Sequence, residues 1–310
     1  MLKGRDLLSI HDLTVEEINE ILELARVLKA KLRGGSEHRL LKGKTLGLIF
    51  EKSSTRTRVS FEAGMYQLGG QAMFLSHRDL QLGRGEPIQD TARVLSRYLD
   101  GIMLRTFGHD KLVEFAQWAA VPVINGLTDL LHPCQALTDL LTIREYCGQN
   151  LRGLKLAYIG DGNNMAHSLM YACAKMGIDF TVATPEGYDP DPQIVQNARA
   201  DAHRLGTLIS LTHDAAEAVK DADILYTDTW ISMGKEEEAD KRRHDFAGYQ
   251  VNRALLQLAA KRAIVMHCLP AHRGEEITAD VFEENADIIF EQAENRLHTQ
   301  KAILALTMGD

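Results

Sequence analysis

Two arginines stand at the predicted start of a helix in the segment FEKSSTRTRVSF, residues 50–61. A strand is predicted to end at Phe50 and a helix to cover residues 54–68, with Ser53 or Ser54 as its N-cap. Free backbone N–H groups, hydroxyls and a guanidinium at such a helix start form a cradle for phosphate or carboxylate. The side chains that would supply it are Ser54, Thr55, Arg56 and Thr57. A capped polar turn would explain the hydroxyl residues but not arginines that oppose the helix dipole, so an anion site is favoured.

The two arginines cannot both serve this site. Arg56 and Arg58 are two residues apart, which places them about 200° apart around a helix. We expect Arg56 to face the anion. Arg58 is expected to serve a carboxylate partner or a subunit contact.

Further polar residues follow other predicted strands of the first half. Arg105 ends one of them, although a lone arginine could equally be a surface residue. His132 and Gln135 open a predicted helix and can donate hydrogen bonds to a carbonyl or phosphate oxygen. A capped helix start explains Pro133 between them, but not the histidine and glutamine.

The second half begins with the segment GDGNNMAHS after a predicted strand over 155–159. Its G-x-G pattern resembles a dinucleotide-binding turn, but Met165 stands where the third glycine is needed. Asn163 and Asn164 either bind a carboxylate or amine, or simply form the turn.

Two later strand ends also carry reactive groups. Asp228 is placed to bind an ammonium group, and residues 232–234 (Ser-Met-Gly) are predicted to form a mobile lid. The alternative is a surface loop, in which Trp230 and Met233 would be unusual. Cys268 is either an inert buried thiol or a pocket residue, and its position favours neither.

No metal and no cofactor is predicted. His267, Cys268 and His272 could suggest a metal site, but neighbouring strand residues point to opposite faces. The sequence contains no Gly-x-Ser-x-Gly nucleophile motif and no phosphate-loop lysine motif.

The elements that must position these residues alternate between apolar strand patterns and helical patterns. This alternation predicts an α/β fold with parallel sheets and helices on both faces, whose ligands bind beyond the carboxyl ends of the strands. Two such sets, divided near residues 148–153, predict two doubly wound parallel-sheet domains joined by helices. The expected strands cover 46–50, 72–75, 102–104, 121–124, 155–159, 180–183, 208–211, 224–227, 264–267 and 288–290. The expected helices follow the capping box TVEE up to Gly34 and cover 54–68, 88–99, 111–119, 135–146 and 293–306, while 235–245 is expected to be a loop.

Bulk properties limit the class of protein. The 310 residues carry a net charge of −8, which argues against nucleic-acid binding and against a membrane surface. No apolar run reaches the roughly 18 residues of a membrane span, and the N-terminus lacks a secretion signal. The 4 cysteines show no CxxC pairing, so free thiols in a cytoplasmic protein are expected.

Four motifs, STRT, HPCQALTD, DTWISMG and HCLP, occur in this order over nearly the whole chain. Together they resemble the aspartate/ornithine carbamoyltransferase family. The last two resemble its ornithine branch, because the aspartate enzymes lack the D-W-SMG loop. Those enzymes also carry Pro-Leu-Pro where this chain has Cys268-Leu269-Pro270.

The resemblance implies a transferase that moves the carbamoyl group of carbamoyl phosphate to the side-chain amine of L-ornithine. The products would be L-citrulline and phosphate, by default in arginine biosynthesis, with the catabolic direction left open. It implies a carbamoyl-phosphate domain over 1–148, joined by the C-terminal helix of about 293–310, and an ornithine domain over 149–292. It also implies a cytoplasmic homotrimer, or a multiple of trimers, with sites between subunits.

The resemblance also assigns residues to each substrate. Those implied for carbamoyl phosphate are Ser54, Thr55, Arg56, Thr57, Gln81 from a neighbouring subunit, Arg105, His132, Gln135, Cys268, Leu269 and Arg296. Those implied for ornithine are Asn164, Asp228, Ser232 and Met233. The implied catalytic residues are Cys268, Arg105, His132 and Asp228.

Several alternatives stay open. Either Cys268 or the leaving phosphate could accept the proton of the attacking amine. The acceptor substrate could instead be aspartate, N-acetylornithine or putrescine. A non-catalytic binding protein of the same fold is the alternative from another class, and a nicotinamide dehydrogenase is a distant third.

Overall fold

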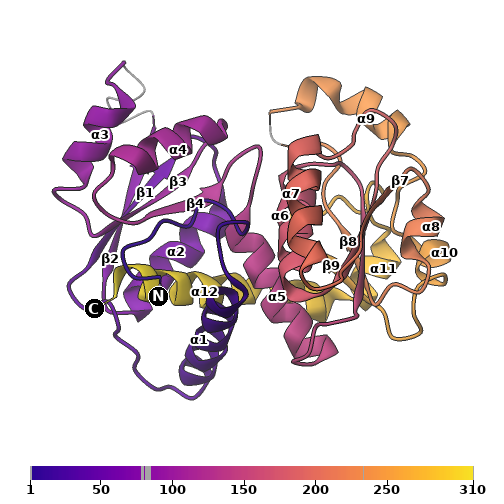
Figure 1. Ribbon diagram of the computed structural model, residues 1–310, viewed down its shortest axis with the longest axis horizontal. Coiled ribbons are helices and arrows are strands. Elements are labelled where there is room, and N and C mark those ends of the chain that lie inside the picture. The colour runs from indigo at the N-terminus through magenta and orange to yellow at the C-terminus, as the bar shows by residue number, and fades with distance from the viewer. Residues whose placement is uncertain (1, 78–79, 81–84, 233, 310) are drawn as a thin grey trace. The chain divides into compact units, whose positions relative to one another are not determined.

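The computed structural model describes residues 2–77, 80, 85–232 and 234–309. The chain divides into two compact units (Figure 1). Unit 1 comprises Met1–Leu141 and Asn295–Asp310, and unit 2 comprises Thr142–Glu294. Within the described residues, no helix is long and apolar enough to cross a membrane.

Unit 1 contains a parallel four-stranded sheet with the order β2-β1-β3-β4. Its strands are β1 (Thr45–Phe50), β2 (Gln71–Ser76), β3 (Gly101–Arg105) and β4 (Val123–Leu127). Its helices are α1 (Val15–Arg33), α2 (Thr55–Gln67), α3 (Ile88–Leu95), α4 (His109–Trp118) and the start of α5 (Pro133–Cys147). The central strands are apolar because helices cover both faces, and Leu46, Leu48 and Ile102 are fully buried.

Unit 2 contains a parallel five-stranded sheet with the order β7-β6-β5-β8-β9. Its strands are β5 (Lys155–Ile159), β6 (Asp179–Ala183), β7 (Ile209–Thr212), β8 (Ile224–Thr227) and β9 (Ile264–His267). Its helical segments are α6 (Asn164–Met176), α7 (Pro192–His203), α8 (Ala215–Val219), η2 (Glu236–Glu238), α9 (Ala239–Asp245), α10 (Arg253–Leu256), α11 (Ala279–Glu284) and the start of α12 (Ala286–Met308). The prediction of two doubly wound parallel sheets is confirmed.

Each sheet reverses its strand order once, between β1 and β3 in unit 1 and between β5 and β8 in unit 2. Crevices open at the carboxyl ends of strands where the order reverses, and ligands of such folds bind there. The segments after these four strands carry the polar motifs that the sequence singles out.

Helix α1 begins as the capping box predicts. The Thr14 hydroxyl accepts the N–H of Glu17, and the Glu17 carboxylate accepts the N–H of Thr14. Gly34 ends the helix. The buried Lys29 of α1 donates to the side chain of Asn295 at 2.6 Å, which ties α1 to α12.

The C-terminal part of α12 packs on unit 1, as expected. Two glycines make room for it. A Cβ at Gly64 of α2 would lie 3.2 Å from Cγ of Lys301, and a Cβ at Gly101 of β3 would lie 2.7 Å from Sδ of Met308. This packing brings Arg296 into unit 1.

Two predicted elements are wrong. The strand expected at 288–290 lies inside α12, where Ile289 is buried but Phe290 is 55% exposed, the one-sided burial of a helix. The loop expected at 235–245 contains η2 and α9. Arg242 stabilises α9 through Glu238 one turn earlier and through Asp161, so a charged run here is helical.

Candidate active site

The start of α2 carries the first cluster of candidate residues. Ser54 is the N-cap, and its hydroxyl oxygen accepts the N–H of Thr57 at 3.2 Å. The first turn of this helix contains no acidic residue. A cavity of about 420 Å³ lies beside it. The lining residues are Phe50, Glu51, Ser53, Ser54, Thr55, Arg58, Phe74, Ser76 and His77. Arg58 thus faces this cavity, whereas Arg56, Thr57 and Arg105 do not line it.

Two guanidiniums converge on the buried hydroxyl of Thr57. Arg105, the last residue of β3, donates to Oγ1 of Thr57 at 3.4 Å, and Arg296 of α12 donates to it at 2.7 Å. Burial, followed by the charges of Arg296 and Arg56, lowers the pKa of Arg105 to about 9. A dianion at this point would offset the repulsion among the three cations.

Arg56 and Arg58 face different surroundings, as their spacing predicts. The Nε atom of Arg58 donates to Glu62 at 2.9 Å, and its guanidinium lies 3.8 Å from the centre of the Phe74 ring. A carboxylate partner was one of the two expectations for Arg58. The Nε atoms of Arg56 and Arg105 are buried and have no hydrogen-bond partner among the described residues.

His132 is buried where α5 begins, and Pro133 is the first residue of that helix. Burial, with smaller contributions from Arg296 and Arg105, holds the pKa of His132 well below its usual range. The imidazole is therefore neutral near pH 7. It can donate one N–H to a carbonyl oxygen, but it cannot act as a cation.

Gln135 presents an acceptor rather than the donor that the sequence led us to expect. Its Nε2 donates to Oδ1 of Asp139 at 2.8 Å, one turn further along α5. Its Oε1 is buried and has no partner among the described residues. The sequence reasoning missed Asp139, although its spacing of four residues from Gln135 was a usable signal.

Unit 2 holds the second cluster, around Asp228 directly after β8. Oδ1 of Asp228 accepts the N–H of Thr229 at 2.8 Å and the thiol of Cys268 at 3.1 Å. Oδ2 accepts Nδ2 of Asn163 at 3.1 Å. Three donors thus fix this carboxylate. A carboxylate beside the Cys268 thiol disfavours the thiolate.

Asn163 is the N-cap of α6 and also binds the hydroxyl of Tyr158. Its Oδ1 accepts the N–H groups of Met165 and Ala166 and also the hydroxyl of Tyr158 at 3.2 Å. The pKa of Tyr158 is raised well above its usual range, first by burial and then by Asp228, Cys268 and Asp161. Asn163 thus contacts Asp228, and Asn164, which the resemblance assigns to ornithine, is the first residue of α6.

The G-x-G pattern before α6 has a packing role. A Cβ at Gly162 would lie 2.4 Å from the backbone nitrogen of Pro190, so no larger residue fits without moving the backbone. The N–H of Gly162 donates to the carbonyl of Tyr188. Close backbone approach thus explains the glycine without a dinucleotide.

The segment after Asp228 is anchored at its start. Trp230 is buried, and its carbonyl accepts Nη1 of Arg242 at 2.9 Å. The same Nη1 pairs with Asp161 at 2.8 Å. Ser232 is half-buried, whereas Met233 and also Gln81 of unit 1 lie outside the described residues.

Contrary to the prediction from the sequence, His267 and Cys268 do not point to opposite faces of one strand. The strand ends at His267, and Asp228, His267 and Cys268 each offer a ligand atom within 4.8 Å of the others. Both ring nitrogens of His267 already have partners, since Nδ1 accepts the N–H of Leu269 and Nε2 lies 3.1 Å from Glu276. Leu269 has a φ of 61°, which turns the chain sharply after Cys268.

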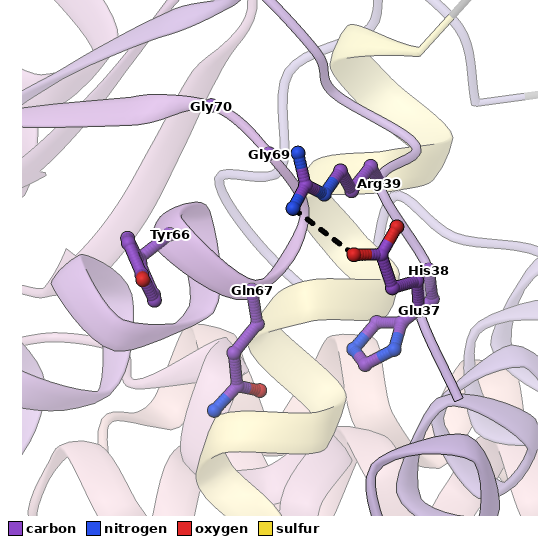
Figure 2. A pocket seen from close by; sticks show the side chains of 7 residues that line it. All are labelled: Glu37, His38, Arg39, Tyr66, Gln67, Gly69 and Gly70. Atoms are coloured by element: carbon purple, nitrogen blue, oxygen red, sulfur yellow. Dashed lines mark hydrogen bonds and ion pairs between the residues drawn. The ribbon is translucent and has the colours of Figure 1, made fainter. Parts of the chain in front are cut away.

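A second cavity, of about 470 Å³, lies beside the C-terminal end of α2 and the residues before β2 (Figure 2). Its lining residues are Glu37, His38, Arg39, Tyr66, Gln67, Gly69 and Gly70. Gly70 precedes β2, so this cavity is near the amino ends of the strands, away from the edge where ligands bind. Arg39 is paired with Glu37 at 3.0 Å, and the buried Lys301 donates to His38 and Gln67. We therefore place the candidate site elsewhere.

Comparison with known proteins adds to this geometry. Two family models match, described as the carbamoyl-P binding domain and the Asp/Orn binding domain of aspartate/ornithine carbamoyltransferase, over residues 5–145 and 152–307. A Symbiobacterium thermophilum protein named ornithine carbamoyltransferase is 58% identical, with 99% of each chain covered. A Pyrococcus furiosus protein named "Ornithine carbamoyltransferase, anabolic" is 56% identical, covering 99% of this chain and 98% of the relative.

A solved structure of ornithine carbamoyltransferase from Pyrococcus furiosus superposes with a TM-score of 0.96 and 55% identity. It covers 99% of this chain, and 98% of that chain is matched. Since family models match both halves and the relatives extend over the full length, the chain belongs to the aspartate/ornithine carbamoyltransferase family.

Proposed function

We propose that this enzyme transfers the carbamoyl group of carbamoyl phosphate to the side-chain amine of L-ornithine, giving L-citrulline and phosphate. The relatives named ornithine carbamoyltransferase support this reaction, and the one named anabolic supports a role in arginine biosynthesis. Within the structure, the observation that carries the proposal is the convergence of Arg105 and Arg296 on Thr57 at the start of α2. This cationic group suits the dianionic phosphate of the first substrate.

We assign carbamoyl phosphate to unit 1 and ornithine to unit 2. The predicted domain limits, at residues 148 and 149 and at about 293, are within seven residues of the limits of these units. The N–H groups at the start of α2 and the cations around Thr57 hold the phosphate. The phosphate ligands are Ser54, Thr55, Arg56, Thr57 and Arg105, with Gln81 reaching in from a neighbouring subunit.

The carbamoyl group requires both donors and an acceptor. Its carbonyl oxygen gains negative charge as the amine attacks, and the neutral N–H of His132 together with Arg56 and Arg296 stabilises that charge. Oε1 of Gln135 accepts a hydrogen bond from the carbamoyl NH₂. These contacts orient the carbon for attack.

We assign ornithine to Asp228, Asn164, Ser232 and Met233, and we assign Cys268 and Leu269 to the carbamoyl group. The attacking amine must lose a proton, since a free alkyl ammonium has a pKa of about 10.4. Because the thiol of Cys268 donates to Asp228, we assign the proton to the leaving phosphate rather than to a thiolate.

We further propose a cytoplasmic homotrimer or a multiple of trimers. The edge strand β2 exposes Met73 and Phe74, and α2 exposes Val59 and Tyr66. Exposed apolar side chains along an unpaired sheet edge favour association. Sedimentation of the purified protein as a monomer would contradict this assembly.

The proposed reaction is tested with labelled carbamoyl phosphate and a panel of L-ornithine, L-aspartate, N-acetylornithine and putrescine. We expect label to enter L-ornithine at least about 100-fold faster than any other acceptor. Of the four compounds, only L-ornithine has both a free α-amino acid group for Asp228 to bind and a side-chain amine to attack the carbamoyl carbon. Faster transfer to another acceptor would identify a different carbamoyltransferase. No transfer despite binding of carbamoyl phosphate would indicate a non-catalytic binding protein.

A further inference from the structure

Gln135 and Asp139 form a buried pair on the first turns of α5. The two residues are four positions apart, so they share one helix face, and Nε2 of Gln135 lies 2.8 Å from Oδ1 of Asp139. Both residues are at most 1% exposed. Water therefore does not compete for this contact.

The pair fixes which end of the Gln135 amide faces which way. A carboxylate only accepts hydrogen bonds, so the NH₂ end of the amide must face Asp139. The carbonyl end, Oε1, then points away from Asp139, and it has no partner among the described residues. A buried acceptor without a hydrogen-bond partner destabilises the free protein. A ligand that donates to Oε1 removes this penalty, which favours its binding.

The neighbouring candidate groups have the opposite character. Arg56, Arg105 and Arg296 are donors only, and the neutral His132 offers an N–H. The N–H of Gln135 donates to the carbonyl of His132, and the charges of Arg296 and Arg105 act on His132, so the Gln135 carbonyl adds an acceptor to a segment whose other candidate groups donate. Such an acceptor is suited to a ligand group that itself donates. Carbamoyl phosphate has one such group, its NH₂, and that NH₂ distinguishes it from an acyl phosphate carrying a methyl group.

We propose that Asp139 is a positioning residue that locks the Gln135 amide so that Oε1 reads the carbamoyl NH₂. This inference deepens the proposed function and rests on it, because the carbamoyl group is the ligand assigned to Gln135. The simpler alternative is that the pair only stabilises the start of α5. In that case a substitution at Asp139 would lower the stability of the fold and would change the affinity for every anionic ligand by the same factor.

The test measures binding of two stable phosphonates by calorimetry, phosphonoacetamide and phosphonoacetone, which differ only in NH₂ against CH₃. The enzyme should bind phosphonoacetamide about tenfold or more tightly, since phosphonoacetone leaves Oε1 unpaired. No preference in the unmodified enzyme overturns the inference at once, without any variant.

Asp139→Asn should reduce that preference to about threefold or less, because asparagine can donate and the Gln135 amide can then turn over. Affinity for inorganic phosphate should stay within about twofold, which reports an intact phosphate cradle. In a Gln135→Leu background, Asp139→Asn should change the preference no further, because Asp139 acts through Gln135. An independent loss in that background overturns the proposal.

A matched control exists on α7. Nε2 of Gln193 donates to Oδ1 of Asn197 at 3.0 Å with the same four-residue spacing, but in an exposed position. Asn197→Ala should leave the NH₂ preference unchanged. Because all readouts are binding, a preference without transfer to ornithine would refute the proposed function alone, and transfer without a preference would refute this inference alone.

Discussion

Arg105 and Asp228 occupy equivalent places in two sheets of different strand order. Arg105 ends β3 and Asp228 follows β8, and each of these strands lies beside the point where its sheet reverses order. Their surroundings differ. The charges that act on Arg105 belong to two other guanidiniums, whereas Asp228 accepts three hydrogen bonds from its own unit.

The difference shows that topology selects where a ligand binds, and that side chains select which ligand. In unit 1 a bound dianion offsets the repulsion among the cations, so this repulsion in the free protein favours binding of the phosphate group. Unit 2 instead holds its carboxylate in a fixed direction, which suits an ammonium group that must be oriented. Substitutions in unit 1 should therefore change the affinity for carbamoyl phosphate, and substitutions in unit 2 should change kcat/KM for ornithine.

The largest effect should follow from Arg56→Ala in unit 1. We expect affinity for carbamoyl phosphate to fall about 100-fold or more, because a buried charged contact to the phosphate is lost. The melting temperature without ligand should not fall, since one of three like charges is removed. Calorimetric titration and thermal unfolding measure the two quantities.

Arg58→Ala is the matched comparison on the same helix. Its partners are Glu62 and the Phe74 ring, so affinity for carbamoyl phosphate should stay within about threefold. Equal losses in the Arg56 and Arg58 variants would show that the two arginines are not divided as the helix geometry indicates.

A smaller loss should follow from Asn163→Ser in unit 2. Serine is a good N-cap, so α6 should keep its stability, but the donor to Asp228 disappears. We expect kcat/KM for ornithine to fall about 10-fold to 30-fold, because one hydrogen bond to a charged group is lost. Steady-state kinetics at saturating carbamoyl phosphate give this value.

Asp191→Ser is the control, because Asp191 caps α7 through the N–H groups of Gln193 and Ile194. It should leave kcat/KM unchanged. If Asn163→Ser behaved like this control, the contact with Asp228 would have no role in orienting substrate.

The smallest effect concerns pH. The pKa of Arg105 in the folded protein, about 9, lies below its ordinary value of 12.5, so its buried charge destabilises the free protein below pH 9. That penalty is relieved as the pH rises above 9 and the proton leaves. A bound dianion needs the proton, so phosphate affinity should fall about fourfold between pH 8 and 9.5.

Calorimetry with inorganic phosphate at several pH values measures this change. His132 should add nothing between pH 7 and 9, because it is already neutral there. A constant affinity up to pH 10 would show that Arg105 does not contact the phosphate.

Much of this architecture could be predicted from local pattern. The capping box at Thr14 and the strand over 155–159 were predicted and are confirmed, and α5 begins at Pro133, two residues before its predicted start at 135. Such features depend on neighbours in sequence, which the chain displays directly. The run at 288–290 was mistaken for a strand because three apolar residues do not reveal their period, and only the long α12 shows it.

Contacts between distant residues could not be predicted in the same way. Arg296 meets Thr57 across 239 positions of sequence, and Asn163 meets Asp228 across 65. The family resemblance suggested Arg296, but nothing in local pattern distinguished Asn163 from Asn164. The orientation of a side chain at a strand end depends on what packs against it.

The sequence by itself determined the order of the elements, two parallel sheets and the strand ends at which polar residues gather, because periodicity and capping are local properties. Only the tertiary structure decided how those residues share hydrogen bonds. It showed that the amide NH₂ of Gln135 donates to Asp139, that Arg58 donates to Glu62 and that the thiol of Cys268 donates to Asp228. These assignments depend on which donor reaches which acceptor in a buried space, and that is settled by packing rather than by residue type.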